Sequence, residues 1–276
     1  MVYNGPMAMR FDPHRFQSTV PYYMRYRVPY PDPLIAGVAE SCGVVRGSPV
    51  LDLGCGPGQL AVAFARLGAA VTALDPEPGM LAAAREHAAA AGATVKIIEG
   101  SSYDLRPALG RFRLVTMGRA FHWMDREATL ALLDRMIEPD GALALFGDRR
   151  IETRQADWRA LLDRLQEEFV PARAAERRTR KQTESPDEVV LLRSAFCALE
   201  RRGAILSRRL SADDVVGRAY SSSTTSPAAL GGGQPAFERA LREGLGRLSP
   251  AGEFRELVEI YALIAKRSGP GCGPSA

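Results

Sequence analysis

The stretch Val50-Leu51-Asp52-Leu53-Gly54-Cys55-Gly56-Pro57-Gly58 decides the fold. A short apolar run stops at three glycines spaced two residues apart, and an alanine-rich amphipathic stretch from Leu60 to Leu67 follows at once. This order predicts a strand, a tight turn and a helix. Glycine lets the backbone of such a turn come close to a ligand, and the start of the helix offers unpaired N–H groups. The stretch therefore predicts a ligand site at the end of a strand.

An acidic residue closes the next expected strand, which runs from Ala70 to Leu74 and is followed by Asp75. A carboxylate accepts two hydrogen bonds, so it suits the two hydroxyls of a ribose. Dinucleotide enzymes also have a glycine-rich turn, but their fingerprint is G-x-G-x-x-G, whereas the spacing here is G-x-G-x-G. A tight strand-to-helix corner without any ligand is the remaining alternative for the turn taken alone.

Together these residues resemble motif I of the class I S-adenosylmethionine (SAM)-dependent methyltransferases, with Asp75 at their ribose-binding position. Four further segments are similar to later sequence motifs of that family and follow in the expected order: residues 74–81, 99–105, 112–117 and 139–145. The resemblance covers residues 50–146. It implies an α/β fold, Rossmann-like, with a doubly wound, mostly parallel seven-stranded sheet and an inserted helical cap. It also implies methyl transfer from SAM, which leaves S-adenosyl-L-homocysteine as the product.

The resemblance places a cofactor site along the carboxyl ends of the strands, with Met80 packed on the adenine. A guanidinium matches a carboxylate, so Arg27 is the first choice and Arg119 the second for the carboxylate end of SAM. The expected cofactor-binding residues are Asp52, Gly54, Gly56, Gly58, Asp75, Pro76, Met80, Ser101, Ser102, Gly118 and Arg27.

An aromatic and arginine-rich segment, Tyr22 to Pro31, precedes the core. Its prolines predict an extended, non-helical path up to a helix that begins at about Pro33. The pattern Tyr-x-x-Tyr-Arg-x-x-Tyr-Pro resembles the N-terminal cover of a subgroup that includes trans-aconitate methyltransferase-like and methyltransferase type 11 proteins. In that subgroup the segment folds over the cofactor. The alternative is a surface loop whose aromatic rings pack on the core.

The segment Ala120-Phe121-His122-Trp123 resembles the same subgroup and follows the fourth expected strand. An ordinary histidine pKa near 6.5 suits a general base, so His122 is the candidate catalytic residue. The other interpretation is a histidine that shapes the loop, with Trp123 as a packing residue. The expected acceptor-binding residues are Tyr26, Tyr30, Phe121 and Trp123.

Composition limits the class of protein. The 276 residues are 46% hydrophobic and 25% charged, as in an ordinary globular protein. No apolar run approaches the ~20 residues that span a bilayer, so no membrane partner is expected. The four cysteines, Cys42, Cys55, Cys197 and Cys272, have no metal-ligand spacing. We therefore expect no metal and a reducing, cytoplasmic location.

The net charge of +4 raises the question of a nucleic-acid partner. The densest basic cluster, residues 173–181, is interleaved with glutamates and contains no aromatic residue for base stacking, which favours a solvated helical face. Residues 117–120 also lack the Asn/Asp-Pro-Pro-aromatic motif of methyltransferases that act on base amines. A small organic acceptor with a carboxylate, hydroxyl or amine group is favoured, and no nucleic-acid partner is expected. The alternatives are a nucleic-acid or protein methyltransferase and a catalytically inactive SAM-binding module.

The expected organisation has five parts, and the sequence gives no indication of the oligomeric state. They are an N-terminal leader and cofactor-covering segment (1–33), a SAM-binding core (34–151), a helical substrate cap (152–190), the remainder of the core with a C-terminal antiparallel hairpin (191–267) and a disordered tail (268–276).

Overall fold

The computed structural model describes residues 15–151 and 158–268. Residues 1–14 of the expected N-terminal leader and cofactor-covering segment lie outside these residues, as does the expected tail beyond residue 268. Within the described ranges, no helix is long and apolar enough to cross a membrane.

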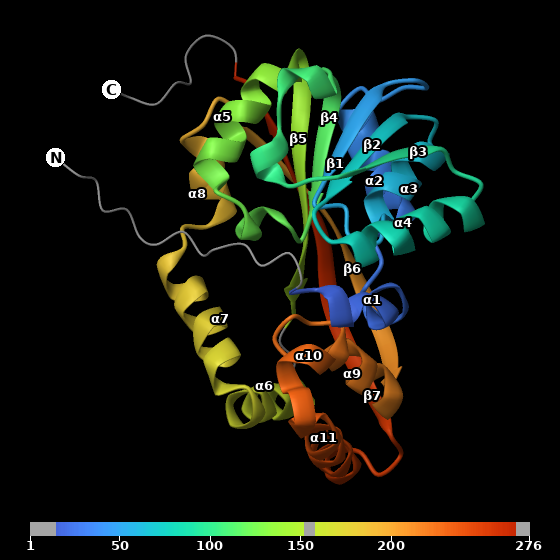
Figure 1. Cartoon of the computed structure of the whole chain (residues 1–276), viewed down its shortest axis with the longest axis vertical. Helices are drawn as coiled ribbons and strands as arrows, with labels where there is room; N and C mark the ends of the chain where they lie inside the picture. Colours follow the sequence, from blue (N-terminus) through green and yellow to red (C-terminus); the bar gives the residue numbers. More distant parts are fainter. Residues whose placement is uncertain (1–14, 152–157, 269–276) are drawn as a thin grey trace, which may run out of the picture.

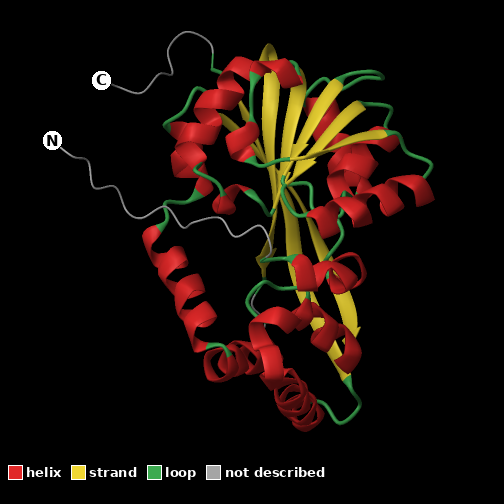
Figure 2. Cartoon of the chain, viewed as in Figure 1, coloured by secondary structure: helices red, strands yellow, loops and turns green. Residues whose placement is uncertain are grey.

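A single seven-stranded sheet forms the centre of the described structure (Figures 1 and 2). Five strands are parallel neighbours, and β7 runs antiparallel between β5 and β6. This topology confirms the expected doubly wound, mostly parallel seven-stranded sheet, and β6 and β7 pair antiparallel at its end. The order across the sheet is β3 (Val95–Glu99), β2 (Ala70–Asp75), β1 (Pro49–Leu53), β4 (Phe112–Gly118), β5 (Ile137–Arg150), β7 (Glu253–Lys266) and β6 (Ala198–Ser211).

Helices cover both faces of the sheet, and each face has its own apolar core. On one face, α2 (Asp32–Ser41), α3 (Gln59–Arg66) and α4 (Pro78–Ala90) bury residues such as Phe64. On the other, α5 (Arg126–Met136) and α8 (Asp187–Leu192) bury residues such as Leu133. The alternation of strand and helix along the chain thus buries the sheet on both sides, as a parallel sheet requires.

A helical lobe lies beyond the carboxyl ends of the parallel strands (Figure 1). Strands β5, β6 and β7 are 14 residues long and extend into it. The lobe is built from α6 (Trp158–Phe169), α7 (Pro171–Thr183), α9 (Ala212–Tyr220), α10 (Pro227–Leu230) and α11 (Gln234–Leu248). Its core holds buried aromatic residues from two stretches of chain, among them Trp158 and Phe237. The region expected as a cap, 152–190, therefore supplies only α6 and α7 to the lobe, while 212–248 supplies the rest.

The expectation of an extended path from Tyr22 to Pro31 is wrong up to Tyr26. Residues Val20–Tyr26 form helix α1, which follows a 3₁₀ turn, η1 (Gln17–Thr19). Pro21 lies in the first turn of α1, where its missing N–H breaks no hydrogen bond. Only residues 27–31 are extended. The other short 3₁₀ turns are η2 (Ser102–Asp104), η3 (Pro107–Leu109), η4 (Phe121–Trp123) and η5 (Gly231–Gly233).

Helix α1 packs on α9 of the lobe at a position where only glycine fits. A Cβ added to Gly217 would lie 2.3 Å from the ring of Tyr26. We predict that Gly217→Ala lowers the free energy of unfolding by about 1–3 kcal/mol, because the ring has to move out of a packed contact. The matched control is Gly246→Ala in α11, where an added Cβ meets nothing within 4 Å. Alanine there should be neutral or stabilising by up to about 1 kcal/mol. Urea denaturation measures both, and equal effects of the two substitutions would contradict the contact.

Candidate active site

One pocket opens at the carboxyl ends of the four strands β1 to β4 and encloses about 750 Å³ of space between protein atoms, its open mouth included. This is the edge where parallel α/β sheets bind ligands. Its lining residues come from the cover (Phe16, Tyr23), the β1 exit (Leu53, Gly54, Gly56), the β2 exit (Asp75, Pro76, Glu77, Met80), the β3 exit (Ser101, Ser102, Tyr103) and the β4 exit (Gly118, Arg119, Ala120, Trp123, Met124).

The glycine turn after β1 has the conformation that its sequence predicts. Gly54, Gly56 and Gly58 have φ angles of +69°, +52° and +80°, which side chains rarely adopt. A Cβ on Gly54 would lie 2.6 Å from that of Ala120, so the turn approaches the β4 exit closely. A Cβ on Gly56 would meet nothing within 4 Å, and this residue lines the pocket. The turn therefore leaves backbone free beside the pocket.

Two buried carboxylates hold the turn in place from adjacent strands. Asp75 accepts the N–H of Gly56 at 2.8 Å and that of Glu77 at 2.9 Å. Asp52 accepts the N–H of Ala61, in α3, at 3.0 Å and the hydroxyl of Thr116 at 2.9 Å. Asp75 lines the main pocket, and each of its oxygens has a further lone pair for a ligand hydroxyl.

Burial dominates the ionisation of both carboxylates. It raises the pKa of Asp52 to about 7, although the hydrogen bonds from Thr116 and Ala61 act in the opposite direction. It likewise raises the pKa of Asp75 to about 6, against the N–H groups of Glu77 and Gly56. Their ionisation is therefore sensitive to pH near neutrality.

The β3 exit is shaped by a local capping arrangement. Ser101 accepts the N–H of Tyr103 at 3.2 Å and donates its hydroxyl to Asp104 at 2.9 Å. Ser101 and Ser102 both line the pocket, as does the apolar side chain of Met80. The backbone N–H of Ser101 also donates to Asp104, at 2.8 Å, so this turn is held by its own hydrogen bonds.

An aromatic wall closes the β4 end of the pocket. Trp123 packs edge to face on Phe16, with ring centroids 5.5 Å apart. The guanidinium of Arg15 lies 4.5 Å from the centre of the Trp123 ring and that of Arg180, from α7, lies 4.3 Å away. Both the N-terminal cover and the helical lobe therefore contact this wall.

The other residues predicted from the sequence divide into two groups. Tyr30 and Asp52 line a smaller pocket over the glycine turn, beside Tyr23, Gly54 and Gly118. The remaining residues do not line the main pocket. Tyr26 lies against Gly217, Phe121 is buried in the core, Gly58 packs on Ala84 of α4, and Arg27 donates to the backbone oxygen of Ser221 at 2.8 and 3.2 Å.

His122 lies on the other side of the aromatic wall. It lines a shallow depression together with Arg126, Arg180 and Tyr261, and not the main pocket. Burial lowers the pKa of His122 to about 3, and the nearby charges of Arg180 and Arg126 act in the same direction. A neutral imidazole with so low a pKa is a weak base at neutral pH. Its role in proton transfer stays a prediction, which this geometry does not favour.

Sequence reasoning did not single out several pocket residues, and the structure indicates why. Tyr23 belongs to the segment expected to cover the cofactor, whereas Phe16 precedes that segment and reaches the pocket at the start of η1. Glu77 is buried at the β2 exit and receives the N–H of Gly79 at 3.2 Å. Its position two residues after Asp75 was the one feature of the sequence that could have indicated that Glu77 lines the pocket.

Comparisons with known proteins agree with this geometry. A family model described as a methyltransferase domain matches residues 50–141. A ubiquinone biosynthesis O-methyltransferase of Azorhizobium caulinodans is 34% identical over 106 residues, which are 38% of this chain and 42% of the relative. One from Xanthomonas oryzae is 39% identical over 103 residues, 37% and 43% of the two chains. These matches span less than half the length of either relative.

Solved structures show the same fold over most of the chain. A SAM-dependent methyltransferase from Thiobacillus denitrificans, in complex with S-adenosyl-L-homocysteine, has a TM-score of 0.54 at 15% identity and covers 93% of this chain and 99% of its own. One from Geobacter sulfurreducens, with the same ligand, has a TM-score of 0.52 at 15% identity, with coverages of 94% and 100%.

Fold and pocket together define a Rossmann-like α/β protein with a site suited to a nucleoside. The family match over residues 50–141 agrees with the sequence motifs, which resemble those of class I SAM-dependent methyltransferases. The comparisons do not confirm the trans-aconitate methyltransferase-like subgroup.

The raised pKa of Asp52 predicts a pH-dependent stability. In the folded state the carboxyl titrates near pH 7, against about 4 in an unfolded chain, so its ionisation destabilises the fold progressively between these values. Asp52→Asn removes this effect. Relative to the wild type, the variant should therefore gain up to about 4 kcal/mol of unfolding free energy as pH rises from about 4 to above 7.

Urea denaturation at several pH values measures the difference. Thr116→Val removes a hydrogen bond that favours the ionised carboxylate, so it should shift the pH window upward. A difference between Asp52→Asn and wild type that stays constant over this range would contradict the assignment.

Proposed function

We propose that the protein is a SAM-dependent methyltransferase that transfers a methyl group to a small organic acceptor. The observation that carries the proposal is the pairing of the glycine turn with Asp75. These two features come from adjacent strands, are joined by one hydrogen bond and line the same pocket. The carboxylate of Asp75 has free lone pairs for the two hydroxyls of a ribose. The glycine turn has no side chains, so the rest of the ligand can lie close to its backbone.

The residues fit SAM part by part. Asp75 would hold the ribose hydroxyls, Met80 and Pro76 would pack on the adenine, and Ser101 and Ser102 would lie at its polar edge. The smaller pocket over the turn, which is lined by Asp52, Gly118, Tyr23 and Tyr30, would hold the amino-acid end. Arg27 is already bonded to the Ser221 carbonyl, so the tyrosine hydroxyls and the turn replace it in this proposal.

Bound SAM supplies a methyl group on a positively charged sulfur, which is displaced in line by a lone pair of the acceptor. The protein has to orient the acceptor and exclude water, and orientation alone can contribute roughly 7–11 kcal/mol. The aromatic wall of Phe16, Tyr23 and Trp123 serves both needs at the β4 end. No strong general base is required, which agrees with the position of His122.

The names of the curated relatives support oxygen as the acceptor atom, among the carboxylate, hydroxyl and amine groups that the sequence leaves open. A nucleic-acid partner is not expected, because arginines of α7 pair with neighbouring acids, as Arg177 does with Asp163 and Arg178 with Glu167. A cytoplasmic location stays a prediction. The alternative is a module that binds SAM without catalysis, and it would show binding but no formation of S-adenosyl-L-homocysteine with any acceptor.

We predict that Asp75→Ala weakens binding of S-adenosyl-L-homocysteine by about 1.5–3 kcal/mol, roughly 10- to 150-fold, because a charged acceptor of two hydroxyls is lost. Isothermal titration calorimetry measures it. The control is Asp140→Ala, a carboxylate paired with Arg113 away from the pocket, which should bind normally. Unchanged affinity of Asp75→Ala would contradict the ribose contact, and a wild-type protein that binds neither SAM nor its product would contradict the proposed function.

A further inference from the structure

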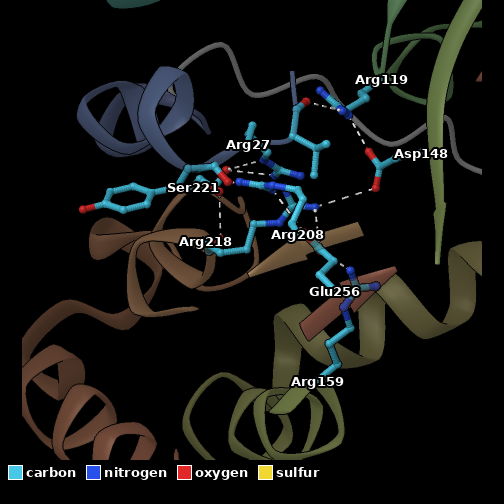
Figure 3. Close-up of polar contacts among 10 residues, drawn as sticks. Arg27, Arg119, Asp148, Arg159, Arg208, Arg218, Ser221 and Glu256 are labelled. Atoms are coloured by element: carbon cyan, nitrogen blue, oxygen red, sulfur yellow. Dashed lines mark hydrogen bonds and ion pairs between the residues drawn. The ribbon is translucent and has the colours of Figure 1, made fainter. Parts of the chain in front are cut away.

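Arg119 is held in one orientation at the β4 exit. Its φ angle is +56°, and it is the only residue other than glycine with a positive φ in the described chain. Its Nε donates to Asp148 at 2.5 Å and its Nη2 to the backbone oxygen of Val28 at 2.8 Å (Figure 3). The guanidinium also lies 4.5 Å from the ring centre of Tyr30. A side chain held at two nitrogens and stacked on a ring has little freedom left.

The third nitrogen of this guanidinium has no partner. The Arg119 side chain is 9% exposed, and its Nη1 is buried without a hydrogen bond to any described residue. A buried charged donor that is left unsatisfied costs about 1–3 kcal/mol or more, so such groups occur where a ligand or water completes them. Arg119 lines the main pocket, which makes a ligand of that pocket the natural partner.

Arg119 lies between the smaller pocket, which it borders through Tyr30, and the end of the main pocket that the nucleoside leaves free in the proposed function. Asp75 and the β3 exit lie on one side of the glycine turn, and the smaller pocket lies over the turn itself. The β4 exit is on the opposite side of β1 from β2 and β3. Arg119, Ala120 and Trp123 therefore border the space that remains for an acceptor.

The charges around this end are unbalanced. Asp148 is approached by Arg119 and, at 3.8 Å, by Arg218, while Arg27 is bonded only to neutral carbonyl oxygen (Figure 3). Glu256 is already paired with Arg159 and Arg208, from α6 and β6. Burial alone would raise the pKa of Asp148, but Arg119 and Arg218 outweigh it and lower that pKa to about 2. Arg218 also lies 3.9 Å from Glu256, so among the described residues the arginines around this end outnumber the two carboxylates, Asp148 and Glu256.

A cationic methyl donor in this setting calls for an anion. SAM carries a sulfonium, an ammonium and one carboxylate, which sum to one positive charge. Placing it beside an excess of guanidinium groups is unfavourable unless the second ligand is negative, and a pocket screened from water strengthens that effect.

We propose that Arg119 is the specificity-determining residue of the acceptor pocket and that, through Nη1, it selects acceptors that carry a carboxylate. This inference rests on the proposed function. Asp148 and the Val28 carbonyl are positioning groups, since they fix the guanidinium and leave one donor for the ligand. The aromatic wall gives the acceptor an apolar surface beside its anionic group.

The test uses protein with ¹⁵N-labelled arginine, saturated with S-adenosyl-L-homocysteine. The probes are benzoate and benzamide, which share a shape but differ in charge. The Nε–H signal of Arg119 is assigned by its loss in Arg119→Met or Arg119→Lys. We expect benzoate to shift this signal saturably and benzamide not to do so. Benzoate affinity should fall at least about tenfold in Arg119→Met, less in Arg119→Lys, and stay unchanged in the control Arg208→Met, which removes a half-buried arginine outside the pocket.

A second titration separates the acceptor from the carboxylate of the cofactor itself. Calorimetry compares S-adenosyl-L-homocysteine with 5′-methylthioadenosine, which lacks the amino-acid group. If Arg119→Met lowers affinity for the first at least about tenfold and not for the second, Arg119 binds the cofactor carboxylate and the proposal is overturned. It is also overturned if benzoate and benzamide shift the wild-type signal alike, or if neither shifts it. A wild-type protein that binds neither nucleoside would instead contradict the proposed function.

Discussion

The hydrogen bond between Asp75 and the N–H of Gly56 is the contact on which the site depends. It joins the end of β2 to the turn that follows β1, and the same carboxylate receives the N–H of Glu77 at the start of α4. One side chain thereby fixes a turn and a helix start around the pocket. Burial of the Asp75 carboxylate is unfavourable for its charged form, as its raised pKa indicates. Carboxylates with such perturbed pKa values are frequent in ligand-binding and catalytic sites.

The two ends of the pocket carry side chains of opposite charge. The buried carboxylates Asp52 and Asp75 hold the turn and the β2 exit, while Arg119 and its neighbours hold the β4 exit. A nucleoside with its hydroxyls matches the first end, and an anion matches the second. The chain of contacts from Arg119 through Asp148 to Arg218 also reaches the helical lobe, so the lobe helps to set the charge of the acceptor end.

The sequence predicted most of the core and part of the site. The apolar runs and the glycine turn placed the parallel strands to within a few residues, because a buried parallel strand must be apolar along its whole length. The end of β2 placed Asp75 beside the turn, since carboxyl ends of parallel strands share one edge. Helix α1 was missed because the prolines of the segment Tyr22 to Pro31 were expected to impose an extended path, whereas Pro29 and Pro31 follow the helix and leave it intact. Tyr26 and Arg27 then turned toward the lobe, to Gly217 and Ser221, and this long-range packing has no local signature.

The acceptor end was the least predictable part, because it depends on pairs of residues far apart in the chain, such as Arg119 with Asp148 and Val28. The central claim, that this strand edge binds a SAM-type nucleoside, is tested most directly by a crystal structure of the protein with S-adenosyl-L-homocysteine. The account predicts the ribose hydroxyls on Asp75, the adenine against Met80 and the sulfur facing the β4 exit. Ligand density that leaves Asp75 and the glycine turn uncontacted would contradict it.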